Sequence, residues 1–175
     1  MSGNLEIRRA YASDMEVLRA LSIQTFSETF SADNTKENME RYLSEAFNEE
    51  ALLREIRQPD TLFFLAFENA LPVGYLKLRV DAPHDGLKPV PAMELERIYV
   101  LKTHQQKHIG AGLLAYSQEL ALSFGCVALW LGVWEHNLKA RGFYESKGFA
   151  NFGSHVFMLG TDPQTDLLMV KYLSE

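Results

Sequence analysis

The segment from Gln105 to Leu114 has the residue types of an anion-binding turn. It lies between an apolar run, which predicts a strand, and an amphipathic run, which predicts a helix. Backbone N–H groups at the start of a helix point outward and the helix dipole adds partial positive charge, so such a turn can hold a phosphate or pyrophosphate. Gly110 lets an anion approach the backbone closely, and Lys107 adds a positive charge. A plain strand-to-helix turn is the alternative, because the segment matches neither a Walker loop nor the dinucleotide fingerprint.

Two histidines and the single cysteine also carry groups that can bind metals or react. His104 and His108 have the i, i+4 spacing of zinc ligands on a helix. They precede the predicted helix, however, Gln105 replaces the glutamate of the HExxH motif, and no third ligand is evident, so we expect no metal. Cys126 alone excludes an internal disulfide and a Cys-rich metal site. We expect it to be a small buried apolar residue rather than a nucleophile.

The elements that would position these residues follow from hydrophobic periodicity and turn signals. In the first half we expect a strand at 5–11, a helix from 13 to about 26, a helix from 34 toward 47, further helical turns at 49–57, and a hairpin of strands 61–68 and 73–80. The capping boxes Ser13–Glu16 and Asn34–Glu37 are the predicted starts of the first two helices.

Residues 81–91 predict a surface loop, because they hold three of the six prolines together with Gly86. Beyond it we expect a strand at 93–101, a helix at 110–124, a central strand at 127–133, a helix at 137–147, and a hairpin of strands 149–157 and 166–173. There is no repeat, no low-complexity segment and no change of composition. Residues 1–175 therefore predict a single α/β domain whose sheet is covered by helices.

Composition and charge favour an ordinary soluble domain. The 175 residues are 47% apolar, and 17 basic against 23 acidic side chains give a net charge of −6. An acidic chain lacks the positive surface of a nucleic-acid binder, whereas it suits cationic partners. No apolar run is long enough to span a membrane, and the N-terminus has no feature of a signal peptide. We therefore expect a soluble, cytoplasmic protein that has neither nucleic acid nor membrane as a partner.

A second motif follows the turn, because Asn137–Phe149 has the form N-x-x-A-x-x-F-Y-x-x-x-G-F. The two motifs in this order resemble the GNAT superfamily of acetyl-CoA-dependent N-acetyltransferases, most specifically over residues 93–173. The bacterial PaiA-type polyamine acetyltransferases are similar in four segments, 95–102, 130–135, 155–160 and 164–167. The resemblance implies a GNAT fold, with a mixed central sheet of about seven strands, splayed central strands and about four flanking helices.

The resemblance also implies where acetyl-CoA binds. Its pantetheine would run like an extra strand between the splayed strands 93–101 and 127–134. Backbone groups of Tyr99 and Val100 would bind it and polarise the thioester carbonyl, as an oxyanion hole does. The residues implied to bind acetyl-CoA are Ile98, Tyr99, Val100, Gln105, Gln106, Lys107, His108, Ile109, Gly110, Ala111, Asn137, Ala140, Phe143 and Lys147.

One position departs from the family's turn, which has the form Arg/Gln-x-x-Gly-x-Gly/Ala. Its marked positions align with Gln105, His108 and Gly110, so a histidine stands where the first glycine is usual. A register on Lys107, Gly110 and Gly112 restores both glycines but moves the following leucine pair out of place. If the turn requires positive φ at 108, the histidine is strained there, which bears on the affinity for acetyl-CoA.

For catalysis, the resemblance implies direct attack of a neutral amine on the thioester. An alkylamine has a pKa near ~10.4, so only about one molecule in 10³ is neutral at pH 7 and a base must remove a proton. Glu96 stands where several GNAT enzymes place a base that acts through water; a strand carboxylate paired with Arg97, or solvated, is the alternative. Tyr144 matches the tyrosine that protonates the leaving CoA thiolate, or else it is a core aromatic residue.

The acceptor implied by the resemblance is a small cationic amine, with spermidine and spermine as first choices. Trp134, Glu135 and His155 are the candidate acceptor contacts. Acetylation of a peptide or protein amine is a second reading, and a CoA-binding regulator without turnover is a third. A homodimer is possible, because dimers are common in the superfamily.

Three aromatic residues of the N-terminal helices, Phe26, Phe30 and Tyr42, could also wall the acceptor site. We expect them instead to pack in the core or in a dimer interface.

Overall fold

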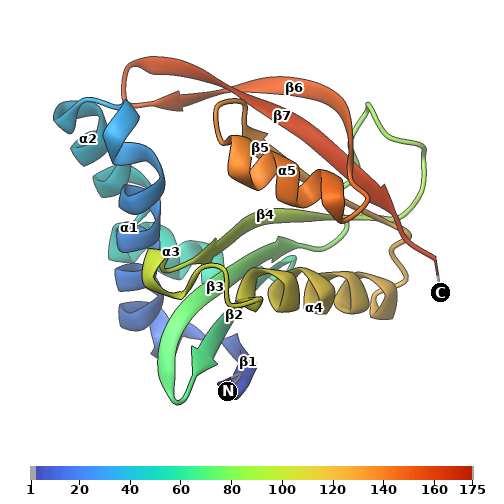
Figure 1. Ribbon diagram of the computed structural model, residues 1–175, viewed down its shortest axis with the longest axis horizontal. Helices are drawn as coiled ribbons and strands as arrows, with labels where there is room; N and C mark the ends of the chain where they lie inside the picture. Colours follow the sequence, from blue (N-terminus) through green and yellow to red (C-terminus); the bar gives the residue numbers. More distant parts are fainter. Residues whose placement is uncertain (1–2, 175) are drawn as a thin grey trace.

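Residues 3–174, which the computed structural model describes, form one seven-stranded sheet with helices on both faces (Figure 1). The strands are β1 (Leu5–Ala10), β2 (Thr61–Glu68), β3 (Leu71–Arg79), β4 (Ala92–Val100), β5 (Ala128–Trp134), β6 (Ala150–Leu159) and β7 (Asp162–Tyr172), in the order β1-β2-β3-β4-β5-β7-β6. The helices are α1 (Met15–Phe30), α2 (Lys36–Ala46), α3 (Glu49–Ile56), α4 (Ile109–Ser123) and α5 (Leu138–Ser146). Neighbouring strands are antiparallel except β4 and β5, so the sheet is mixed, as the resemblance predicted.

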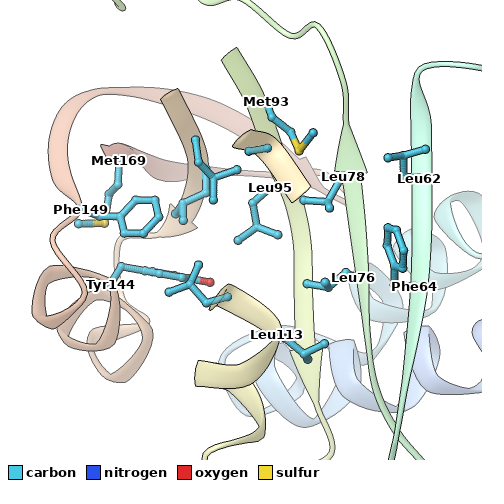
Figure 2. Close-up of a cluster of buried hydrophobic side chains, with 14 of the residues drawn as sticks. Leu62, Phe64, Leu76, Leu78, Met93, Leu95, Leu113, Tyr144, Phe149 and Met169 are labelled. Atoms are coloured by element: carbon cyan, nitrogen blue, oxygen red, sulfur yellow. The ribbon is translucent and has the colours of Figure 1, made fainter. Parts of the chain in front are cut away.

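Strand β2 is apolar on both faces because each face is covered by a helix. On one face, Phe63 and Leu65 pack with Leu18 of α1. On the other face, Phe64 packs in the cluster that includes Leu113 of α4 (Figure 2). This core holds α4 against β3 and β4 and thereby fixes where the helix begins.

The two central strands, β4 and β5, separate soon after they start. Their parallel pairing runs from Ala92–Ala128 to Glu94–Trp130, and no paired residues follow although both strands continue. The backbone edges beyond these pairs therefore face each other across a gap. The expected splay of the central strands is confirmed.

A β-bulge in β4 lies directly beyond the last of these pairs. Lys77 of β3 is paired with Arg97 and Leu78 with Leu95, so Glu96 is an extra residue without a partner on β3. A bulge bends its strand and redirects the side chains around it. It therefore turns β4 away from β5 at the position of Glu96.

The predicted start of α1 is wrong by one residue, because Asp14 rather than Ser13 is the residue before the helix. The helix begins at Met15, and Ser13 belongs to a preceding 3-10 turn rather than to a capping box. The carboxylate of Asp14 closes this turn, because its Oδ2 accepts the N–H of Tyr11 at 3.0 Å. An Arg8–Asp14 ion pair of 2.9 Å engages the other oxygen, so the expected serine cap has no place in this geometry.

The predicted start of α2 is wrong by one residue. Thr35 caps the helix, since its Oγ1 accepts the N–H of Asn38 at 3.2 Å. Asn34 is not the cap, because its side-chain amide donates to the carbonyl of Phe30 at 2.8 Å. The turns expected at 49–57 form a full helix, α3, so residues 3–174 hold five α-helices rather than about four. None of these helices is long and apolar enough to cross a membrane.

Candidate active site

A cleft with a volume of about 1030 Å³ opens where β4 and β5 separate. Its walls come from β4, β5, α1, α5 and the segment that leads into α4. Of the site residues expected from the sequence, it is lined by Glu96, Ile98, Tyr99, Val100, Gln105, Gln106, His108, Gly110, Ala111, Trp134, Asn137, Ala140, Phe143, Tyr144 and Lys147. The fold thus brings the residues of both motifs to one cavity.

Four expected site residues do not line this cleft. The Lys107 ammonium lies 3.7 Å from the carboxylate of Glu68. The Ile109 side chain is buried in the main core. Glu135 and His155 also stand outside the lining.

The turn before α4 presents free backbone donors to the cleft. Gln106 and His108 are both in the left-handed region, at φ +64° and +61°, so the strain foreseen for a histidine at 108 is present. No side chain caps α4 at His108, and the first N–H groups of a helix have no acceptor within it. A Cβ on Gly110 would meet no atom within 4 Å, so the start of the helix is open. This arrangement suits an anion with several oxygens, such as a pyrophosphate.

Lysine side chains, and a glutamine that links two elements, lie around the open start of α4. Gln105 donates from Nε2 to the carbonyl of Val100 at 3.2 Å and accepts from Lys139 Nζ at 3.0 Å, which ties the turn to β4 and α5. Lys102 and Lys147 line the same cleft. The positive charges fit a phosphorylated group.

Asn137 shapes the other side of the cleft by starting α5. Its side-chain oxygen accepts the N–H of Ala140 at 3.2 Å, which caps the helix. The cap turns Ala140 and Phe143 toward the gap between β4 and β5, where both line the cleft. These apolar groups suit an uncharged arm rather than a phosphate.

Tyr144 extends from α5 into the apolar cluster and also lines the cleft. Figure 2 shows its ring directed toward the middle of the cluster, with the hydroxyl at the inner end. The ring packs edge-to-face with Phe149 at 5.7 Å between centroids. Burial raises the pKa of the Tyr144 hydroxyl above its ordinary value. The group therefore stays protonated at neutral pH and can donate a hydrogen bond or a proton.

Glu96 belongs to a chain of ion pairs on the face of β4 that lies away from the apolar cluster around Tyr144. Lys77, whose side chain is only 6% exposed, lies 2.7 Å from the Glu96 carboxylate and 3.1 Å from that of Glu55. The expected alternative, in which Glu96 pairs with Arg97, is wrong, because Arg97 pairs with Glu55 at 3.2 Å. The bulge explains this, since it brings two consecutive charged side chains to one cluster. The second oxygen of Glu96 is buried and has no hydrogen-bond partner within residues 3–174.

Glu94 lies on the same strand, two residues before Glu96. Burial, and then the negative charge of Glu96, raise the pKa of the Glu94 carboxyl to about 7. Its only ion pair within residues 3–174 is long, 3.5 Å to Arg79. Glu94 does not line the cleft.

Aromatic rings from four elements, α1, α2, β5 and β6, form another wall of the cleft. Phe26 stacks on Phe30 and on Tyr42, with centroids 4.4 Å apart in each case, and Phe30 lies 5.3 Å from Trp134. All four pack in a second core cluster, which was expected from the sequence for Phe26, Phe30 and Tyr42, but they also line the cleft together with Phe157. The expectation of core packing alone is therefore incomplete.

Asp166 of β7 lines the cleft and was missed from the sequence. The one available signal is its position as a lone acidic residue at the start of the apolar run Leu167–Val170. Lys102 and Lys139 were missed as well, although Lys139 lies within the second motif.

No group of three His, Cys, Asp or Glu side chains within residues 3–174 is arranged to hold a metal ion. Cys126 is buried, as expected of a small apolar residue.

A mixed sheet whose parallel central strands part beside an open helix start defines the class of CoA-dependent acyltransferases. The chain belongs to the acetyltransferase (GNAT) family, which matches residues 23–149. It is an N-acetyltransferase that uses acetyl-CoA as its acetyl donor.

Relatives with the same fold extend over nearly the whole chain. An uncharacterized N-acetyltransferase of Lactobacillus delbrueckii subsp. lactis is 38% identical and covers 97% of this chain and 98% of its own. A spermidine N(1)-acetyltransferase of Thermoplasma acidophilum is 27% identical over 83% of this chain and 88% of its own. The crystal structure of the PaiA N-acetyltransferase of Thermoplasma acidophilum in complex with coenzyme A has a TM-score of 0.78 and 25% identity, covering 97% and 99% of the two chains.

Proposed function

We propose that this N-acetyltransferase acetylates a primary amine of a small cationic molecule, with polyamines of the spermidine and spermine type as first-choice acceptors. One observation carries the proposal: a single cleft joins the uncapped start of α4, where lysines gather, to a wall of aromatic rings and to acidic side chains that include Glu96 and Asp166. The first part suits a phosphorylated donor and the second suits an amine that is charged in solution.

The donor side of the cleft offers partners for each part of acetyl-CoA. The backbone N–H groups of 108–111 would bind the pyrophosphate, and Lys139 and Lys147 would offset its charge. Backbone groups of β4 at Ile98, Tyr99 and Val100 have no partner on β5, so an extended amide-bearing arm would complete their hydrogen bonds. Lys107 pairs with Glu68, and we do not include it among the ligands.

The chemistry requires a proton to leave the amine and another to reach the leaving sulfur. Acetyl-CoA supplies an activated thioester, which a neutral amine can attack. Glu96 would take the amine proton through water, since its carboxylate lines the cleft and one of its oxygens has no hydrogen-bond partner within residues 3–174. Tyr144 would donate to the departing sulfur, because its hydroxyl lines the same cleft and stays protonated.

Two features favour a polyamine among amine acceptors. Aromatic rings such as Phe30 and Trp134 bind both methylene chains and cations. The carboxylates of Glu96 and Asp166 add negative charge to the same cavity. The spermidine N(1)-acetyltransferase of Thermoplasma acidophilum, 27% identical, supports the same class of acceptor.

The contacts between α2 and the β6–β7 hairpin favour a small acceptor over a peptide or protein amine (Figure 1). The side-chain oxygen of Asn34 accepts from Gln164 Nε2 at 2.6 Å. The side-chain oxygen of Asn38 accepts the N–H of Thr161 at 3.1 Å. These contacts tie the start of α2 to the hairpin that carries Phe157 and Asp166 of the cleft, which suits a small acceptor better than a bulky one.

The test is release of CoA thiol from acetyl-CoA with a panel of amines. The panel contains spermidine, spermine, shorter diamines, amino acids, an aminoglycoside and a short peptide. We expect saturable turnover with the polyamines and little with the peptide. Turnover with the peptide alone would refute the proposed acceptor class, and acetyl-CoA binding without turnover on any amine would favour a regulator.

A further inference from the structure

Asp166 lies on the face of the sheet that carries the aromatic wall. It is directly opposite Trp134 of β5 and directly opposite His155 of β6. Residues opposite each other on antiparallel strands share a face, so the three side chains form one row across the sheet. The Asp166 side chain is 20% exposed and lines the cleft.

Gly132 provides the space that this carboxylate occupies. It lies two residues before Trp134 on β5 and therefore on the same face. A Cβ at Gly132 would lie 3.2 Å from Asp166 Oδ2 and 3.3 Å from His155 Cε1. Because no side chain is present, the carboxylate and the imidazole can lean over β5 toward the cleft.

The carboxylate of Asp166 is poorly neutralised for a group so largely buried. Its only ion-pair partner within residues 3–174 is His155, with Nε2 3.4 Å from Oδ2, and that imidazole is 45% exposed. Glu96, in contrast, has the buried ammonium of Lys77 at 2.7 Å. Burial raises the pKa of the Asp166 carboxyl. A cation that entered the cleft would supply the charge that the protein does not.

Glu96 and Asp166, two of the four acidic residues that line the cleft, lie at different distances from the point where β4 and β5 part. Glu96 is two residues beyond Glu94, the last paired residue of β4, which is roughly 7 Å along the strand. Asp166 is opposite Trp134, four residues beyond the last paired residue of β5, which is roughly 13 Å. An acceptor with two nitrogens joined by methylenes could therefore direct one nitrogen toward each carboxylate.

We propose that Asp166, positioned by His155 in the space above Gly132, binds the non-reacting ammonium group of a diamine or polyamine acceptor. The inference rests on the proposed function and adds the carboxylate that would set its specificity. The reacting nitrogen would lie near Glu96 and the acetyl donor, while the distant nitrogen stays protonated on Asp166. A monoamine of the same chain length would lack this second contact.

The test compares Asp166→Asn with the wild type on two matched acceptors, butane-1,4-diamine and butylamine. The measured quantity is the ratio of kcat/KM for the diamine to kcat/KM for the monoamine. We expect the substitution to lower this ratio roughly 10- to 100-fold, the range for loss of one charged hydrogen bond. Asp85→Asn is the matched control, because it removes the same charge from an exposed loop position outside the cleft, and the ratio should stay within about twofold.

A second variant covers the case in which Asp166→Asn fails to fold. Gly132→Ala keeps both charged groups but moves them, so it should raise KM for the diamine more than for the monoamine. An unchanged ratio in both variants, or equal losses with both acceptors, overturns the inference. A wild type that turns over monoamines as well as diamines overturns it too, while the acetyltransferase function stands. A wild type inactive on every amine overturns the proposed function, and the inference falls with it.

Discussion

Replacing Tyr144 with phenylalanine separates the chemistry of the hydroxyl from the packing of the ring. The ring contacts Phe143 and Phe149 at centroid distances of 5.4 and 5.7 Å, and phenylalanine keeps both. No side-chain hydrogen bond within residues 3–174 uses the hydroxyl, so the free energy of unfolding should change by less than about 0.5 kcal/mol. General acids typically contribute about 10²- to 10⁴-fold to a rate. The leaving thiol has a pKa of about 8.5 and is a stable anion, so we place the expected loss of kcat lower, at about 10- to 100-fold.

The assay for Tyr144→Phe is steady-state release of CoA thiol with the best amine of the panel, together with calorimetric titration of acetyl-CoA. The KM and Kd for acetyl-CoA should stay within about twofold, because the hydroxyl acts on the leaving group rather than on binding. Since burial raises the pKa of Tyr144, the loss should be equal across the neutral pH range. An unchanged kcat, under conditions where a viscosity test shows that product release is not limiting, would refute the role as acid.

Three further substitutions test other parts of the structure. Glu96→Gln should lower kcat/KM for the amine most strongly below about pH 8, where little of the amine is neutral; an identical pH profile would exclude it as the base. Glu94 has its pKa raised from 4.5 to about 7, so the stability that it contributes is present below 4.5 and lost as pH rises through 7. Glu94→Gln should therefore make the free energy of unfolding increase relative to the wild type between pH 5 and pH 8, by about 1–2 kcal/mol after allowance for solvent, as denaturant titration would show. Gly160→Ala places a Cβ against the side chain of Asn38 at φ +64° and should lower Tm by about 3–10 °C, more than Gly125→Ala, which has φ +76° but open space. Equal losses in the two alanine variants would assign the effect to backbone strain alone.

The element order and the central splay could be predicted because their signals are local or carried by motifs. Apolar β2 and the run 128–134 have patterns that fit buried strands, and the predicted ranges agree with the structure within a few residues. The two motifs placed most of the donor-side residues on one cleft. The helix starts failed for a physical reason. Asp14 accepts the Tyr11 N–H and closes a turn that contains Ser13, while Asn34 donates to the Phe30 carbonyl, and a sequence pattern does not rank such partners.

The acceptor side could not be predicted in the same way, because its residues meet only through the sheet. Asp166 and His155 become neighbours through the pairing of β6 with β7, and Gly132 joins them through the pairing of β5 with β7. None of these contacts has a spacing that a single sequence reveals. The ion pair predicted for Glu96 was wrong for a similar reason. The observed partner, Lys77, lies on another strand, and the bulge determines which charged side chains meet.

The turn before α4 shows how a locally unfavourable backbone can serve binding. Two non-glycine residues, Gln106 and His108, adopt positive φ, each at a cost of roughly 1 kcal/mol or more. The conformation persists because Gln105 is held on both sides, by the Val100 carbonyl and by Lys139. This turn leaves the start of α4 uncapped, beside Gly110 with its open space. The unused N–H groups of the helix therefore point to where a phosphate would enter. A ligand that accepts those hydrogen bonds offsets part of the strain, and a histidine in place of the usual glycine is therefore compatible with acetyl-CoA binding.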